Sequence, residues 1–290
     1  MQAVVAVVGP DESVPRVVAR PFLKWAGGKR RIVPRLLERL TRPIGRYHEP
    51  FVGGGALFFS LAQRLEDRAE RWATLTDMNL RLVRAYRGIK NDFDGVVERL
   101  DAYRAGHCET QYYATRGNDI DACSEDADVA AWMIYLNRTG FNGLYRVNKS
   151  GGFNVPLGRY DNPTILDEGN LRAVNRVLQN VEVRHADFTN VFFEAQRGDA
   201  VYFDPPYVPL SKTSNFTAYT KGGFGPVDQL RLRDIAWELK RRGVDVVLSN
   251  HDTAEVRELY RDFHIESVLV GRAINSKAGG RGKVAEVIIS

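Results

Sequence analysis

The sequence has little cysteine and no long apolar run. Its only two cysteines, Cys108 and Cys123, are too few for a disulfide scaffold or a zinc site of the usual paired kind, so a reducing compartment is expected. The five histidines form no metal-like grouping with them, and we expect no metal cofactor. Residues 1–8 are apolar but lack a basic start and are followed by Gly9-Pro10, which predicts neither a signal peptide nor a membrane span. We therefore expect a cytoplasmic protein with no membrane partner.

The composition also lacks low-complexity tracts, repeats and a strong excess of one charge. With 44% hydrophobic and 27% charged residues, the 290-residue chain is typical of a globular protein with one large core and a smaller lobe. The net charge of +5 is a weak indication of an acidic partner such as nucleic acid.

The periodicity predicts an α/β protein with an insertion. The first part predicts, in order, a helix over 29–40, a strand over 47–51, a helix over 56–65 and a strand over 73–76. Residues 79–126 then read as helical without clear strands, followed by a helix over 127–137 and a basic, aromatic stretch over 138–160. From residue 167 the alternation resumes, with strands expected at 181–184, 200–203, 244–248, 265–270 and 284–289. Helices are expected from residue 167 onward, at 227–241 and at 253–262.

Strands that alternate with helices indicate a parallel sheet, so we predict a Rossmann-like sheet formed by residues 21–79 and 167–290. Residues 80–166 are expected to be an inserted, mainly helical domain, and residues 1–20 an N-terminal extension. The last two strands are close in sequence and resemble an antiparallel pair at the sheet edge.

Asp204-Pro205-Pro206-Tyr207 is the most informative tetrapeptide. It follows the predicted buried strand at 200–203, and neither proline has an N–H to donate, which leaves a stiff backbone with free carbonyls. The Asp204 carboxylate and the Pro205 carbonyl can each accept one N–H of an exocyclic amine, while Tyr207 stacks on the ring that carries it. The alternative is a simple turn at the end of a strand.

A second candidate site begins at the glycine loop 53–55, which follows the strand at 47–51. Glycines allow close backbone approach to a ligand, and Asp77, at the end of the next strand, can accept from a ribose diol. No Gly-Lys-Ser/Thr follows, so a nucleoside without a triphosphate, such as S-adenosylmethionine, fits better than a nucleotide. A tight turn is the alternative.

Two further segments suit the same ligand. Asp187 could accept from an adenine amino group while Phe188 packs on its ring; a helix N-cap is the alternative for Asp187. Residues 22–29 combine an aromatic residue, Trp25, with two glycines and two lysines and have no helical or strand period.

In this order the segments resemble the Dam-type DNA adenine-N6 methyltransferases of the D12 class. The matching strings are residues 22–29, 49–53, 136–138, 141–144, 153–156, 158–160, 204–207, 215–219 and 249–253. The resemblance implies that 80–166 is a target-recognition domain carrying a β-hairpin. It also implies that S-adenosylmethionine is the methyl donor, leaving S-adenosylhomocysteine.

The local chemistry and the resemblance together assign residues to the two ligands, and for the cofactor the resemblance itself covers Trp25, Lys29, Asp77 and Asp204. The expected cofactor-binding residues are Trp25, Lys29, Phe51, Gly53, Gly55, Asp77, Asp187, Phe188 and Asp204. The expected DNA-binding residues are Lys24, Arg138, Phe141, Asn142, Leu144, Arg146, Pro156 and Tyr160. Tyr145 departs from the small residue expected between Leu144 and Arg146. Phosphate contacts are expected from basic side chains at Arg138, Lys149, Arg159, Arg272, Lys277, Arg281 and Lys283.

The expected activity is methyl transfer to adenine N6 in double-stranded GATC, by a monomer associated with the nucleoid. The target base must be flipped out of the duplex, and residues 209–224 are expected to order over it, or else to be an ordinary connection. A longer site such as GATATC, a methyltransferase for RNA or a protein amide, and a catalytically silent DNA-binding regulator are the alternatives.

Overall fold

The computed structural model describes residues 17–25, 27–40, 42–65, 70–207, 224–271 and 283–290. Most of the N-terminal extension, nearly all of the loop 209–224 and the string at 215–219 lie outside these ranges. So do Arg272, Lys277, Arg281 and the side chain of Lys283. None of the described helices is both long enough and apolar enough to cross a bilayer.

Seven strands form one sheet in the order β3-β2-β1-β4-β5-β7-β6. The parallel strands are β1 (Tyr47–Glu49), β2 (Ala73–Asp77), β3 (Val181–His185), β4 (Ala200–Phe203) and β5 (Asp245–His251). The last two, β6 (Ile265–Gly271) and β7 (Lys283–Ile289), run antiparallel and form one edge. The predicted α/β class and the antiparallel edge pair are confirmed.

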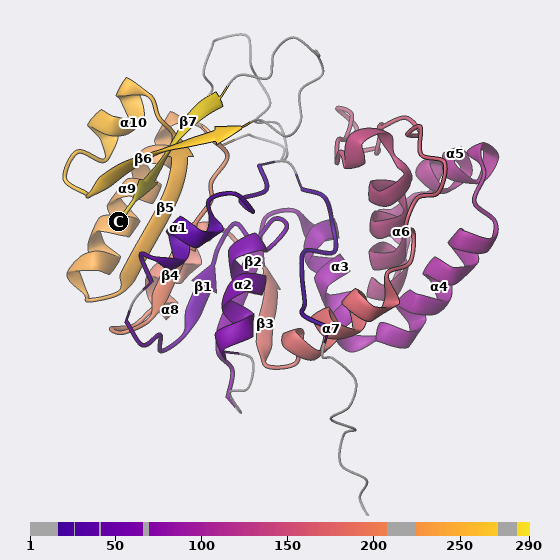
Figure 1. Cartoon of the computed structure of the whole chain (residues 1–290), viewed down its shortest axis with the longest axis horizontal. Helices are drawn as coiled ribbons and strands as arrows, with labels where there is room; N and C mark the ends of the chain where they lie inside the picture. Colours follow the sequence, from indigo (N-terminus) through magenta and orange to yellow (C-terminus); the bar gives the residue numbers. More distant parts are fainter. Residues whose placement is uncertain (1–16, 26, 41, 66–69, 208–223, 272–282) are drawn as a thin grey trace, which may run out of the picture.

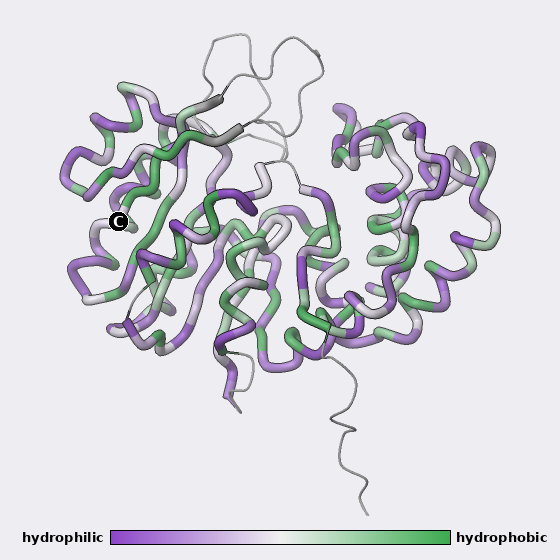
Figure 2. The backbone as a smooth tube through the Cα atoms, viewed as in Figure 1, coloured by the Kyte–Doolittle hydropathy of each residue, from purple (hydrophilic) through white to green (hydrophobic). Residues whose placement is uncertain are grey.

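Alternate residues of a strand point to opposite faces of the sheet, and a hydrophobic cluster packs on each face. In β4, Ala200 and Tyr202 belong to one hydrophobic cluster, whereas Val201 and Phe203 belong to the other. Helix α1 (Val33–Leu37) precedes β1, and strands of the sheet are connected by α2 (Ala56–Leu65), α8 (Val191–Glu194), α9 (Pro226–Arg241) and α10 (Ala254–Leu259). Hydrophobic and hydrophilic residues alternate along the helices (Figure 2), and many of the apolar residues of the strands and helices are buried.

The residues expected to form an insertion fold as helices beside the sheet (Figure 1). They are α3 (Leu80–Asn91), α4 (Phe93–Ala105), α5 (Glu109–Gly117) and α6 (Asp126–Thr139), with 3-10 turns η1 (Ile120–Ala122) and η2 (Phe141–Gly143). Then α7 (Glu168–Leu178) returns the chain to β3. The side chains of Asn79, Asp92 and Asp167 cap α3, α4 and α7. Almost every residue of α6 is buried, so it is the central helix of this group.

Several predicted elements were wrong in extent, including the strand expected at 244–248, which is Asp245–His251, and the helix expected at 253–262, which is Ala254–Leu259. The helix expected over 29–40 starts at Val33, because Pro34 is tolerated only in the first turn; Lys29 to Ile32 form a turn instead. The first strand ends at Glu49, before Pro50. Between Gly140 and Leu157 the chain doubles back, but only the isolated bridges Gly140↔Leu157 and Val147↔Phe153 pair, rather than two continuous strands.

Candidate functional site

The carboxyl ends of β1, β2 and β4 bring three acids to one edge of the sheet: Glu49, Asp77 and Asp204. Ligands of open α/β sheets bind at this edge. Burial raises the pKa of all three carboxyl groups. Buried acids with raised pKa values favour a cation as partner, because a nearby positive charge would stabilise their ionised forms.

The glycine loop lies directly after β1 and depends on glycine at two positions. Gly53 and Gly55 have φ values of 48° and 66°, which L side chains rarely adopt. A Cβ at Gly53 would lie 2.8 Å from the Trp25 ring, and one at Gly55 would lie 2.8 Å from the Tyr86 hydroxyl. The loop is therefore packed beneath Trp25, a residue that the sequence analysis assigned to the same ligand.

Asp77 connects this loop to the end of β2. Its carboxylate accepts from the Gly53 N–H at 3.1 Å and from the Asn79 N–H at 2.9 Å. Each carboxylate oxygen has a second lone pair, so both can still accept from a further donor. The Tyr86 hydroxyl donates to the Gly53 carbonyl at 3.1 Å and holds the other side of the loop. This geometry suits the predicted contact with a diol.

Asp204 lies beside Lys29, in an arrangement that the sequence did not predict in detail. The ammonium of Lys29 is 3.0 Å from the Asp204 carboxylate and 4.4 Å from the centroid of the Tyr207 ring. Lys29 is buried, and Ser249 donates a hydrogen bond to Asp204 at 3.0 Å. Burial raises the pKa of Asp204, while Lys29 opposes that shift. The pair places one positive charge between the acid and the aromatic ring.

The two prolines leave one carbonyl in use and one free. The Pro206 carbonyl accepts from the Gln229 amide at 3.1 Å, and Gln229 accepts in turn from Asn250 at 3.3 Å. The Pro205 carbonyl has no hydrogen-bond partner within the described ranges. It is thus available for an amine, as the tetrapeptide chemistry requires.

Tyr207 is fixed by residues outside the tetrapeptide. Its hydroxyl donates to Glu286 of β7 at 3.1 Å, and its ring meets His251 edge to face at 4.7 Å. The sequence analysis did not assign a role to Glu286, although a single acid within the apolar run 284–289 was a visible signal. Ser249 and Gln229 were also missed.

The segment at 187–188 has a packing role. The Asp187 carboxylate accepts from the Thr189 N–H at 3.0 Å and caps η3 (Phe188–Asn190), which is the alternative that the sequence left open. The Phe188 ring is buried and stacks on Phe51, with centroids 5.4 Å apart. Phe224 meets both rings edge to face at 5.6 Å. The predicted ligand residues Phe51 and Phe188 are thus brought together as part of an aromatic cluster.

Asn137 ties Lys24 to the 141–143 turn. Its buried side-chain amide accepts from the Lys24 N–H at 2.8 Å and donates to the carbonyls of Lys24 and Gly143 at 2.8 and 2.7 Å. The Lys24 ammonium itself is 5.0 Å from the centroid of the half-exposed Tyr160 ring. Two segments more than a hundred residues apart are therefore held as one surface.

The remaining predicted DNA-contacting residues differ in exposure. Phe141 and Asn142 are exposed, with Asn142 at a φ of 56°, and Pro156 is exposed while Leu144 is half-buried. Arg138 instead turns inward and donates to the Phe22 carbonyl at 2.9 Å, and burial lowers its pKa. Arg138 is therefore less open to solvent than expected of a phosphate contact, and that contact stays a prediction.

Arg146 and Tyr145 point to different partners. Arg146 donates through Nε to the Asn154 side chain at 2.7 Å and through Nη2 to the Asn154 carbonyl at 3.1 Å. Tyr145 stacks on Trp25, with centroids 5.3 Å apart and planes at 27°. Tyr145, the residue that departs from the family pattern, thus connects the segment 141–146 to Trp25, which packs on the glycine loop.

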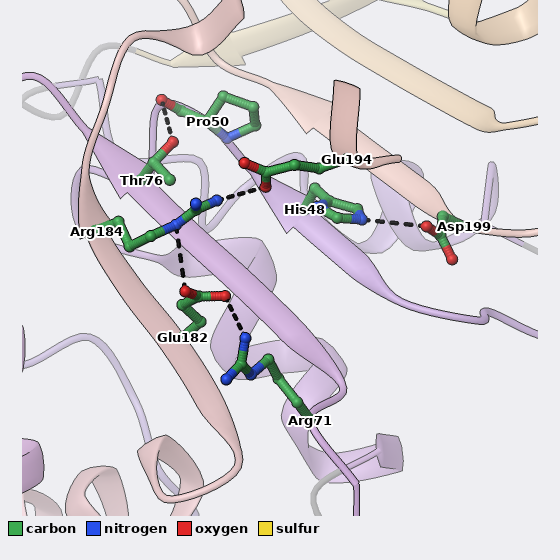
Figure 3. A network of polar contacts seen from close by, with 8 residues as sticks. All are labelled: His48, Pro50, Arg71, Thr76, Glu182, Arg184, Glu194 and Asp199. Atoms are coloured by element: carbon green, nitrogen blue, oxygen red, sulfur yellow. Dashed lines mark hydrogen bonds and ion pairs between the residues drawn. The ribbon is translucent and has the colours of Figure 1, made fainter. Parts of the chain in front are cut away.

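A separate polar network occupies the face of β1–β3 (Figure 3). His48 lies 3.2 Å from Asp199, and Arg184 bridges Glu182 and Glu194. Near it, a cavity of about 550 Å³ opens at the amino ends of β1, β2 and β4, lined by Arg46, Arg71, Trp72, Glu194 and Asp199 among others. The cavity contains no residue of the tetrapeptide or the glycine loop, so we assign the chemistry to the opposite edge.

The raised pKa of Glu49 predicts that the stability of the fold depends on pH. Glu49 is buried and accepts from the Tyr47 hydroxyl at 2.7 Å, and burial raises its pKa from 4.5 to about 8. A raised pKa means that the folded state holds the proton more tightly than the unfolded state. The stabilising effect is therefore complete below about pH 4.5 and is lost as the pH rises through about 8.

We expect Glu49→Gln, which cannot ionise, to melt at a higher temperature than the wild type above pH 8, with a smaller difference near pH 5. Thermal melts across this pH range measure the effect. Glu38→Gln, at an exposed position, is the matched control and should follow the wild-type curve. Parallel curves for Glu49→Gln and the wild type would show that Glu49 is ionised in the folded chain.

Comparisons with known proteins agree on one family. The profile of the D12 class N6 adenine-specific DNA methyltransferases matches residues 25–274. The chain is 41% identical to a Type II methyltransferase, M1.LlaDCHI, of Lactococcus lactis subsp. cremoris, over 95% of this chain and 96% of the relative. It is 42% identical to a Type II methyltransferase, M.MjaIII, of Methanocaldococcus jannaschii, over 90% and 95%. A DNA adenine methylase of Vibrio cholerae is 37% identical over 93% and 95%.

Proposed function

The chain belongs to the D12 class of N6 adenine-specific DNA methyltransferases, and from this premise we propose that its target is the adenine of GATC in double-stranded DNA. We propose further that it acts as a monomer and that the target base is flipped out of the duplex, because N6 is inaccessible inside the helix. The observation that carries the catalytic assignment is the placement of two acceptors side by side: the half-buried Asp204 carboxylate and the Pro205 carbonyl, which has no partner within the described ranges.

The crevice fits S-adenosylmethionine by its chemistry. This cofactor supplies a methyl group on a positively charged sulfur. The carboxyl groups of Glu49, Asp77 and Asp204 lie at the same edge of the sheet and would favour a bound cation. The free lone pairs of Asp77 suit the ribose hydroxyls, and glycine at position 53 lets the backbone pack directly against the Trp25 ring. Phe51 and Phe188 offer aromatic surface for the adenine ring of the cofactor.

Asp204 and the Pro205 carbonyl would accept the two N6 hydrogens of the target adenine. The N6 lone pair is delocalised into the ring, so acceptors at both hydrogens favour a pyramidal nitrogen and stabilise the positive charge that develops during attack. Tyr207 provides the stacking surface, which helps to offset unstacking of the flipped base, a cost of a few kcal/mol. Lys29, now paired with Asp204, must yield part of that contact when the amine arrives.

We propose that residues 80–166 form the target-recognition domain, with Lys24 reading the first guanine of GATC. Arg146 would read the guanine at the outer base pair. Asn154 accepts from Nε and from one Nη2 hydrogen of its guanidinium, whereas Nη1 has no partner within the described ranges, so the Nη1–Nη2 edge keeps unused hydrogens. That edge can pair with guanine O6 and N7, the most common specific contact in the major groove.

Arg146→Ala should relax the requirement at the outer base pair of GATC while the GAT portion is still required. A bidentate arginine–guanine pair contributes about 1–3 kcal/mol of discrimination, roughly a 5- to 150-fold preference. Single-molecule sequencing of a methylated DNA library measures the preference at each position.

Lys149→Ala, which removes an exposed basic side chain from the same segment, is the control. It should weaken all sequences alike and reduce the salt dependence of binding. Digestion of methylated plasmid by a nuclease that GATC methylation blocks tests the site itself. Complete cutting of plasmid that has incorporated labelled methyl groups would exclude GATC, and the sequenced pattern would then identify a longer site such as GATATC.

A further inference from the structure

Glu286 is the one acid of β7, and the other residues from Val284 to Ile289 are apolar. It lies in β7 opposite His251 of β5, and Val287, Ile288 and Ile289, which follow it, are all buried. Burial raises the pKa of Glu286 and Asp204 adds to that shift, while Lys29 opposes it. A carboxyl group in such surroundings is costly unless it has a specific partner.

The partner is Tyr207. Its hydroxyl donates to the Glu286 carboxylate at 3.1 Å, and this is the hydrogen bond that joins the edge hairpin to the Asp-Pro-Pro-Tyr segment. The backbone before Tyr207 is stiffened by two prolines, and its ring edge is set by His251. Holding the hydroxyl removes the remaining freedom of the ring to swing away from the crevice.

We propose that Glu286 is a positioning residue for methyl transfer, which holds the Tyr207 ring in the plane on which the target adenine stacks. This inference rests on the stacking role given to Tyr207 under the proposed function. An aromatic surface stabilises a flipped base only when it already stands at the stacking position, since otherwise base binding must also order the ring.

The geometry defines which substitutions keep the contact. In Glu286→Gln the amide oxygen can still accept from the tyrosine hydroxyl, although the charge is lost. In Glu286→Asp the charge remains, but the carboxylate is one methylene further from the hydroxyl. A positioning role therefore predicts that the glutamine variant is the more active of the two, whereas a role for charge alone predicts the reverse.

The experiment compares these variants in single-turnover methyl transfer to duplex DNA with adenine at the target position. Binding to a second duplex, which carries 2-aminopurine in place of the target adenine and cannot accept the methyl group, reports base flipping. We expect Glu286→Asp and Glu286→Ala to lower the transfer rate about 10-fold, as for loss of one hydrogen bond, with the KM for S-adenosylmethionine changed less than about 2-fold. Glu286→Gln should stay within about 3-fold of the wild type. The 2-aminopurine signal should fall in step with the rate.

Tyr207→Phe removes the same hydrogen bond from the other side. If Glu286 acts through that hydroxyl, adding Glu286→Asp to Tyr207→Phe should lower the rate less than about 2-fold further. Multiplicative losses, or an aspartate variant that is as active as the wild type, would overturn the proposal. Glu266→Ala, which removes an acid of β6 paired with Arg39, controls for general weakening of the hairpin.

Failure of the inference can be separated from failure of the proposed function. If Tyr207→Ala and Asp204→Ala both leave transfer unchanged, the catalytic role of the tetrapeptide is wrong. If both abolish transfer while all Glu286 variants behave as the wild type, only the positioning role is wrong. Should Glu286→Ala melt below the assay temperature, the ranking of the glutamine and aspartate variants decides the question.

Discussion

Asp204→Ala is expected to reduce methyl transfer at least about 100-fold, because removal of a preorganised group that stabilises developing charge has effects of this size. Transfer of labelled methyl groups to plasmid DNA measures the loss, and a gel-shift assay should show that DNA is still bound. A variant that retains more than about a tenth of the wild-type rate would contradict the polarising role.

The substitution also leaves Lys29 buried without its acid, which is destabilising in its own right. Asp204→Asn is therefore tested as a second variant. Its amide keeps the shape of the side chain and one acceptor, and we expect this variant also to lose most of the activity. Asp245→Ala is the matched control, since Asp245 begins β5 at the opposite edge of the sheet, where it pairs with Arg42. Full activity of that variant shows that loss of an acid near the sheet is not enough to stop transfer.

Asp77→Ala should weaken binding of S-adenosylmethionine by roughly 1–3 kcal/mol, or about 5- to 150-fold in Kd, since hydroxyls that it accepts from would be stranded. The variant also strands the N–H groups of Gly53 and Asn79, so the glycine loop loses its attachment to β2. Both effects act in the same direction on affinity. Titration calorimetry of the free enzyme with the cofactor gives the Kd directly.

Asp92→Ala provides the comparison for Asp77. Asp92 also accepts from a backbone N–H, that of Gly95 at 3.1 Å, but it caps α4, away from the crevice. It should lower the melting temperature without changing the Kd. Unchanged affinity in Asp77→Ala would place the ribose elsewhere.

Local chemistry was readable from the sequence wherever neighbouring residues carried it. Alternating apolar runs predicted the strands, and Asp204-Pro205-Pro206-Tyr207 predicted an acid and a free carbonyl at a strand end. What failed depended on distant parts of the chain. The ion pair between Lys29 and Asp204 and the bond between Tyr207 and Glu286 join segments whose meeting only the sheet order determines.

Arg138 and Asp187 show a second limit. A basic residue beside a recognition segment and an acid after a strand both suggest ligand contacts. Each also has a backbone partner in the fold, because Arg138 donates to the Phe22 carbonyl and Asp187 caps η3, and their ligand contacts stay predictions. Sequence pattern cannot distinguish a side chain that satisfies its own backbone from one that waits for a ligand, because both uses require the same chemical group.

The packing of α6 bears on whether the helices and the sheet unfold in one step. Trp132 and Leu136 of this helix belong to the same continuous hydrophobic cluster as Tyr202 and Val247 of the sheet. Because this cluster extends without a break from the helices to one face of the sheet, we expect the two parts to unfold together. A single melting transition and a single hydrogen-exchange protection class for α6 and β4 are the expected signature.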